Sequence, residues 1–143
     1  MIPKFESTGL LPKGVHRATW EEVVERFGRN RKRHQLLKGL QEALELLRRA
    51  GCCRVYLDGS FVTDKKSPND IDVCWDVDGV DPMLLDSVFF DFQNGRAAQK
   101  ARFGVEFFPA QAPQRLKTFL DFFQIDKDTG KQKGIIEILL DDR

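Results

Sequence analysis

Residues 54–78 read RVYLDGSFVTDKKSPNDIDVCWDVD and place two strand patterns on either side of a turn. Residues 54–58 are short, β-branched and aromatic enough to form a strand, which Gly59 and Ser60 then end. Acidic and apolar residues alternate over most of residues 70–78, and this period of two predicts a second strand. One face of that strand is expected to carry Ile71, Val73, Trp75 and Val77.

Helical patterns precede and follow these two strands. A capping box at Thr19 and Glu22 predicts a helix over about 20–27, and Asn30 begins a second one that reaches about Arg49. The opening segment, rich in proline and glycine, is expected to form an extended arm anchored by Ile2, Phe5, Leu10 and Leu11. Later patterns predict helices at 82–90 and 95–102, a strand at 105–108, a helix from Pro113, a turn at 126–130 and a strand at 135–140.

These elements predict an α/β fold of the α+β kind, with a small mixed sheet flanked by helices and preceded by an N-terminal arm and helix pair. The 143 residues suit one domain, divided into the arm and helices (1–50), the catalytic core (51–110) and a C-terminal helix and strand (111–143). No signal peptide or long apolar run is present, so we expect a cytoplasmic protein that does not enter a membrane. The three cysteines are interpreted as reduced, mostly buried thiols.

The net charge of +1 conceals an uneven distribution. Residues 1–50 hold 11 Lys and Arg against 6 Asp and Glu, whereas residues 51–143 hold 12 against 16. The acidic part would repel a nucleic-acid backbone but suits divalent cations, so the chemistry is expected there. A basic run could touch RNA or an acidic partner, although it is more typical of a solvated helix start: Arg29, Arg31, Lys32, Arg33 and His34.

The turn and the second strand contain residue types that suit phosphate and metal binding. Glycine lets the backbone approach a triphosphate, and a serine at a helix start offers donors to phosphate oxygens, so Gly59 and Ser60 are candidate phosphate binders. Asp70 and Asp72 stand two residues apart on a strand and project from the same face, roughly 6 to 7 Å apart at the backbone. Because a pair of Mg²⁺ or Mn²⁺ ions would offset their mutual repulsion, both are candidate metal ligands.

The order of these segments resembles the signature of the nucleotidyltransferase superfamily, which includes polymerase-beta-like enzymes. The order is a strand, Gly59-Ser60, a nine-residue connection and then Asp70-Ile-Asp72. The resemblance implies a third carboxylate on a later strand, and Glu106 is the acidic residue within the 105–108 strand. It further implies that Asp70, Asp72 and Glu106 hold Mg²⁺ or Mn²⁺. The implied reaction transfers a nucleotide from a nucleoside triphosphate and releases pyrophosphate.

Simpler interpretations stay open for several of these residues. The alternation continues through Asp76 and Asp78, as it would on a strand whose polar face meets water. Lys65 and Lys66 lie in the connection and could reach phosphates, although loop lysines are usually solvated. The same two interpretations apply to basic residues near the start of the Glu106 strand: Arg96, Lys100 and Arg102.

The whole chain resembles a family of uncharacterised bacterial and phage-associated proteins, through YLDGSFVTDKKSPNDIDVCW, NGRAAQKARFGVEFFPA and KGIIEILL. That family is similar to the minimal nucleotidyltransferases of toxin–antitoxin and defence modules, which implies a protein or RNA acceptor. Two features depart from the superfamily: Glu106 stands where many members have Asp, and no separate domain holds the substrate. Specificity would then come from the terminal segments, a dimer mate or a partner. The alternative function is a catalytically inactive fold that acts as an antitoxin or binding module.

Overall fold

The computed structural model describes residues 1–110, 124–125 and 130–140. The helix predicted from Pro113 lies outside the described residues, as does most of the turn predicted at 126–130. Next to that turn, Ile125 and Gln132 form an isolated antiparallel bridge.

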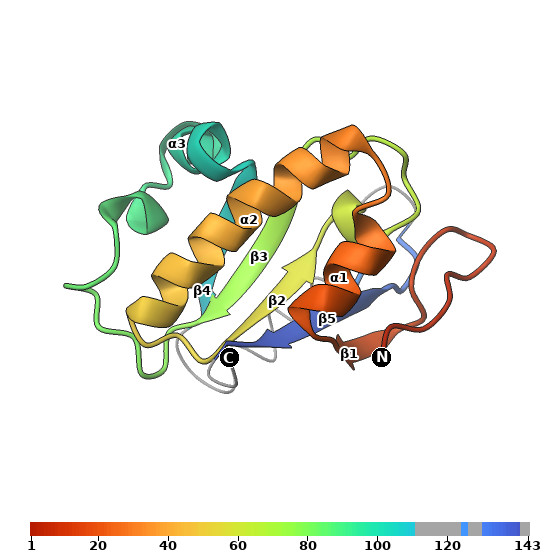
Figure 1. Ribbon diagram of the computed structural model, residues 1–143, viewed down its shortest axis with the longest axis horizontal. Helices are drawn as coiled ribbons and strands as arrows, with labels where there is room; N and C mark the ends of the chain where they lie inside the picture. Colours follow the sequence, from red (N-terminus) through yellow and green to blue (C-terminus); the bar gives the residue numbers. More distant parts are fainter. Residues whose placement is uncertain (111–123, 126–129, 141–143) are drawn as a thin grey trace.

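The described residues form an α+β fold built on a mixed sheet of five strands, which confirms the predicted fold class. The strands lie in the order β1-β5-β2-β3-β4, and the β1–β5 and β3–β4 pairs are parallel whereas the other two are antiparallel. Figure 1 labels the elements. Their bounds are β1 Gly14–Arg17, α1 Trp20–Phe27, α2 Arg31–Arg49, β2 Arg54–Asp58, η1 Ser60–Val62, β3 Ile71–Asp76, η2 Ser87–Phe90, α3 Gln93–Phe103, β4 Val105–Ala110 and β5 Gly134–Leu139.

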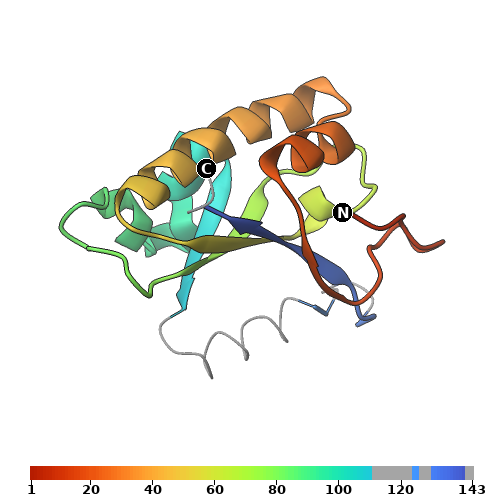
Figure 2. The same ribbon diagram turned by 60° about the horizontal axis from the view of Figure 1, so that its bottom comes forward.

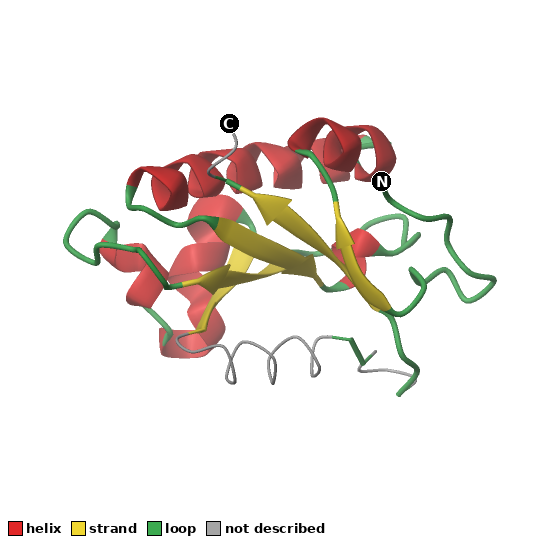
Figure 3. Ribbon diagram, turned by 90° about the horizontal axis from the view of Figure 1, so that it is seen from below, coloured by secondary structure: helices red, strands yellow, loops and turns green. Residues whose placement is uncertain are grey.

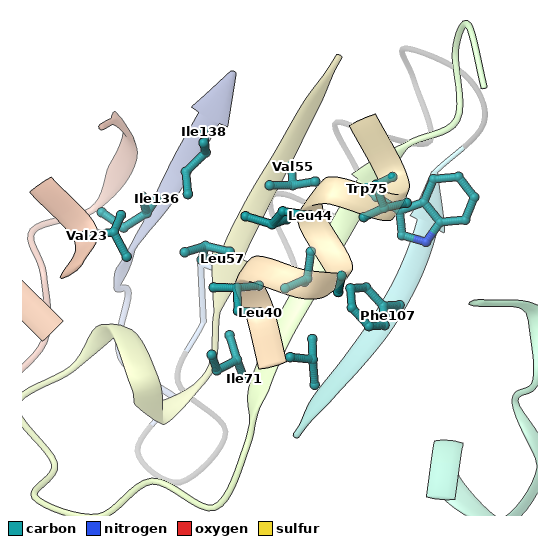
Figure 4. Packing of buried hydrophobic residues seen from close by; sticks show 14 of the residues in the cluster. Val23, Leu40, Leu44, Val55, Leu57, Ile71, Trp75, Phe107, Ile136 and Ile138 are labelled. Carbon is teal, nitrogen blue, oxygen red and sulfur yellow. The ribbon is translucent and has the colours of Figure 1, made fainter. Parts of the chain in front are cut away.

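Helices α1 and α2 cover one face of the sheet, here called the core face (Figure 2). Leu40 and Leu44 of α2 point into a layer of strand side chains, and Figure 4 shows them close to Leu57. Full burial of each such leucine stabilises the fold by roughly 1.5 to 3 kcal/mol. The strands supply alternate residues to this core: Val55, Leu57, Ile71, Val73, Trp75, Val105, Phe107, Ile136 and Ile138.

The residues between these core positions lie on the opposite face, here called the second face, because neighbouring side chains of a strand point to opposite sides. In Figure 3 the sheet is seen from below, with the helices behind it. The second face carries a small buried cluster of Tyr56, Cys74, Ala110 and Ile135, with Phe108 packed against it. Among the described residues this face also carries ion-paired acidic and basic side chains, and it holds the candidate site.

The local helix signals are confirmed, because each rests on contacts between near neighbours. Thr19 and Glu22 form the expected capping box, with Oγ1 of Thr19 accepting from the Glu22 amide at 3.1 Å. Asn30 caps α2 by accepting from the Arg33 amide at 3.0 Å. Among the described residues, no helix is long and apolar enough to cross a membrane.

Two predictions of local structure were wrong. The opening arm is anchored by buried Ile2, Leu10 and Leu11, but it also contributes the edge strand β1, which pairs with β5 more than a hundred residues away. Residues 82–90 were expected to form a helix and instead form turns followed by η2. Asp81 and Asp86 explain the second error, because their carboxylates bind the amides of Met83 and Val88 and so favour turns.

Candidate functional site

Three acidic side chains stand side by side across the second face, on β2, β3 and β4. Asp58 is the register partner of Asp72, and Asp72 is the register partner of Glu106. Because adjacent strands lie roughly 5 Å apart, each acid is an immediate neighbour of the next. We call Asp58, Asp72 and Glu106 the acidic row. Sequence reasoning placed Asp72 and Glu106 in one site, and the sheet brings these two together.

Gly59 lies directly against the middle of this row. Its φ of 86° and ψ of −171° belong to a region that only glycine adopts readily. A Cβ atom built on Gly59 would lie 3.1 Å from Oδ2 of Asp72, so a side chain there would press on that carboxylate. Ser60 follows at the start of η1, which is a single 3₁₀ turn and not the longer helix that a phosphate-binding helix start would need.

Asp70 precedes β3 and is partly buried, two residues before Asp72. The carboxylates of Asp70, Asp72 and Glu106 form an all-oxygen donor set, which is the kind that Mg²⁺ and Mn²⁺ prefer. Within the described part of the chain, however, no three acidic, histidine or cysteine side chains are gathered closely enough to hold an ion. The donor chemistry therefore fits a divalent cation, and binding would require the side chains to turn toward one another.

A lysine is ion-paired at each end of the acidic row. Lys133 contacts Asp58 with 3.0 Å between Nζ and Oδ1, and both side chains are almost fully buried, at 7% and 5% exposure. Lys100 contacts Glu106 with 3.2 Å between Nζ and Oε1, and these side chains are 40% and 22% exposed. Lys133 and Asp58 were not recognised from the sequence, because no local pattern predicts a pair joining the end of β2 to the residue before β5.

The start of α2 holds the loop between Ser60 and Asp70. Arg33 is fully buried, and its guanidinium donates to the carbonyls of Phe61, Thr63 and Lys65. The prediction that the basic run is a solvated helix start was therefore wrong at Arg33. Burial lowers the pKa of this guanidinium to about 10, so it remains charged at neutral pH while it fixes the loop.

Lys65 and Lys66 lie in this loop with exposed side chains, and neither forms an ion pair within the described residues. The loop backbone beside them is tied to α2, since Asn30 also donates to the Lys66 carbonyl at 2.7 Å. Helix α2 covers the core face, opposite the acidic row. The contacts that fix the two lysines thus do not direct them toward Asp72, and their assignment to phosphate stays a prediction.

Buried neutral groups lie next to the acidic row. Tyr56 and Cys74 each lie two residues along their strands from the acids of the row, on the same face, and both are nearly inaccessible to solvent. Burial raises the pKa of the Cys74 thiol to about 12, with Asp76 adding to the effect. Burial also raises the pKa of Tyr56. Neither group is suited to act as an anionic nucleophile near neutral pH.

The continued alternation through Asp76 and Asp78 has a separate structural cause. Asp76 approaches Arg54 across the strand pair, at 3.6 Å between Oδ2 and Nε, and also accepts from the Asp78 amide at 3.0 Å. Asp78 is exposed and follows the end of β3. Because buried Tyr56 and Cys74 lie on the same face, the second face is not simply a polar surface exposed to water.

The described fold and site define an α+β protein with an acidic row beside a glycine turn. Residues 3–139 match the family of unknown function DUF6932, and the chain belongs to that family. Comparison with curated proteins and with solved structures found no match.

Proposed function

We propose that this protein is a metal-dependent nucleotidyltransferase that moves a nucleotide from a nucleoside triphosphate to a hydroxyl of a protein or RNA. The observation that carries the proposal is the in-register pairing of Asp72 with Glu106 on one face of the sheet, with Gly59 against Asp72. Asp70 precedes Asp72 by two residues and would complete the set of oxygen donors.

In this proposal Asp70, Asp72 and Glu106 hold Mg²⁺ or Mn²⁺. When bound, such an ion lowers the pKa of an acceptor hydroxyl and offsets the charge of the phosphates. Gly59 leaves space for the substrate to approach the backbone, and Ser60 offers its hydroxyl to a phosphate oxygen. The acceptor hydroxyl gives up its proton to solvent as its oxygen forms a bond to the α-phosphorus, the bond to the bridging oxygen breaks, and pyrophosphate leaves with the electron pair. Such a reaction suits the cytoplasm, where nucleoside triphosphates and Mg²⁺ are available.

The test is transfer of label from each α-³²P nucleoside triphosphate, with Mg²⁺ or Mn²⁺ and a cell extract as the source of acceptors. We expect a labelled product with the wild-type protein and none with Asp70→Asn/Asp72→Asn. Asp78→Asn/Asp81→Asn is the matched control, because both acids are exposed and follow β3. Failure of the wild-type protein to transfer any label would contradict the proposal, as would unchanged transfer by the Asp70→Asn/Asp72→Asn variant.

The second candidate is a nucleotidyltransferase fold that binds a partner without catalysis, for example as an antitoxin. The ion pairs of Asp58 with Lys133 and of Glu106 with Lys100 favour it, because they neutralise two of the three acids of the row internally. In that case a small protein should co-purify with the chain. The same association should survive Asp70→Asn/Asp72→Asn, whereas an enzyme held to its target by metal and nucleotide would lose it.

A further inference from the structure

The two lysines of the acidic row differ in how firmly they are held. Lys133 and Asp58 are both desolvated, and separating them would leave an uncompensated charge inside the protein. Lys100 and Glu106 are partly exposed, and an ion pair of that kind contributes little to stability because water screens it. The Asp58 pair is therefore a permanent part of the fold, whereas the Glu106 pair can open at small cost.

Helix α3, which carries Lys100, is held in place by contacts other than the Lys100 ion pair. Gln99 accepts from the Phe107 amide at 2.8 Å, and Arg96 donates to the Phe107 carbonyl at 2.9 Å. Both contacts join α3 to β4, the edge strand of the described sheet. Gly104, with a φ of 71°, then turns the chain directly from α3 into β4. Because these contacts fix the helix, only the Lys100 side chain must move for the ammonium group to leave Glu106.

We propose that Lys100 is an exchangeable counter-ion, which neutralises Glu106 in the metal-free protein and passes to a phosphate of the nucleotide when a divalent cation takes Glu106. This inference rests on the proposed function. A cation at Glu106 repels the ammonium group, and the triphosphate that accompanies the cation offers it a new anionic partner close by. Lys100 thus disfavours the bare metal and favours the metal together with its nucleotide.

The proposal predicts opposite effects of one substitution on two ligands. Lys100→Met removes the competitor for Glu106, so Mn²⁺ should bind about two- to five-fold more tightly, as expected for loss of an exposed ion pair. At saturating Mn²⁺, the same variant should bind the nucleoside triphosphate more weakly by a similar factor. A lysine that only stabilised the fold would not produce opposite changes, because a loosened site would weaken both ligands.

The experiment is a Mn²⁺ titration followed by the electron paramagnetic resonance signal of the free ion. A nucleotide titration at saturating Mn²⁺ follows, with each of the four ribonucleoside triphosphates in turn. Lys100→Arg keeps the charge and should return both affinities toward the wild-type values. Lys38→Met is the control, because it removes an exposed lysine of α2, and it should leave both affinities unchanged.

The outcomes separate this inference from the function on which it rests. If wild-type protein binds Mn²⁺ and loses it with Asp72→Asn, but Lys100→Met binds Mn²⁺ no more tightly, the role of Lys100 is disproved and the metal site stands. An unchanged nucleotide affinity in Lys100→Met also overturns the exchange. If wild-type protein binds no Mn²⁺, or Asp72→Asn binds it equally well, both the proposed function and the role of Lys100 are disproved.

Discussion

Gly59 and Asp72 are the residues on which the candidate site most depends. The backbone of Gly59 is in a conformation that other residues adopt only with strain, and the Asp72 carboxylate occupies the space where a side chain would start. A turn of this shape lets the chain leave β2 and still keep Asp72 close to the end of that strand.

Gly59→Ala should destabilise the protein by about 1 to 3 kcal/mol, because it adds both backbone strain and a contact with Asp72. Gly95→Ala is the matched control. Gly95 also has a positive φ, of 62°, but a Cβ there would meet nothing within 4 Å, so only about 1 kcal/mol should be lost. Urea unfolding measures both changes. Equal losses in the two variants would show that the contact with Asp72 has no energetic role.

Part of this site could be predicted from the sequence at the level of single residues. The alternation around Asp72 and the short apolar strand around Glu106 are local patterns, and both strands formed, although β3 ends at Asp76 and β4 continues to Ala110. The neighbours of these acids could not be predicted in the same way. Asp58 meets Lys133 only because β2 lies between β3 and β5, and strand order is a property of the whole sheet.

At the level of elements, the start of α2 and the loop after Ser60 act as one unit. Arg33 joins the two by donating to carbonyls of the loop and also to the Phe27 carbonyl at the end of α1. Its sequence context, among four other basic residues, gave no sign of burial. A buried arginine in a charged run is recognisable only when the backbone that it binds is known.

Arg33→Met should destabilise the protein by about 3 to 5 kcal/mol, because it leaves several buried carbonyls without a donor. It should also make the loop at residues 63–69 the first site of proteolytic cleavage. Arg31→Met is the control, because Arg31 lies two residues earlier in the same basic run and its side chain is exposed. Urea unfolding and limited proteolysis give the two measurements. A loss below 1 kcal/mol with no change in cleavage would contradict the anchoring role.

The elements that were predicted wrongly are those whose structure depends on contacts that a local sequence pattern does not show. α1 and α2 are specified by their caps and by apolar residues at three- and four-residue steps, so their bounds matched. β1 is a strand because it pairs with β5 at the edge of the sheet. Nothing within Gly14–Arg17 indicates that distant partner. Residues 82–90 have a helical composition, but the aspartates bind nearby amides and favour turns.

At the level of the whole molecule, the two faces of the sheet differ in the side chains that they carry. The core face is filled by the apolar sides of α1 and α2, and it supplies the large area of burial that stabilises the fold. Among the described residues, the second face has a small buried cluster, next to which the acidic row lies. Stability and the proposed chemistry are thus separated on opposite sides of one sheet.

This separation predicts how the three thiols react. Burial raises the pKa of both Cys52 and Cys74 to about 12, whereas Cys53 is partly exposed. At pH 8, iodoacetamide should therefore label Cys53 in the folded protein and all three cysteines in urea. Mass spectrometry counts and locates the labels. Labelling of Cys74 in the folded state as fast as Cys53 would contradict the burial of the second face.

The same two thiols should make the fold sensitive to high pH. Because folding holds Cys52 and Cys74 protonated, their contribution to stability is complete below the ordinary thiol pKa of 9.0 and is lost as the pH rises toward about 12. The double variant Cys52→Ala/Cys74→Ala should lose less stability than the wild-type protein over this range. Urea midpoints at pH 7, 9 and 10.5 measure the difference.

The most direct test of the proposed metal site is anomalous diffraction from crystals grown with Mn²⁺ and a nucleoside triphosphate analogue that cannot be cleaved. The account predicts an anomalous peak within bonding distance of carboxylate oxygens of Asp72 and Glu106, with Asp70 beside it and Lys100 turned toward a phosphate. A site that stays without a peak at saturating Mn²⁺, with Lys100 still paired to Glu106, would contradict it.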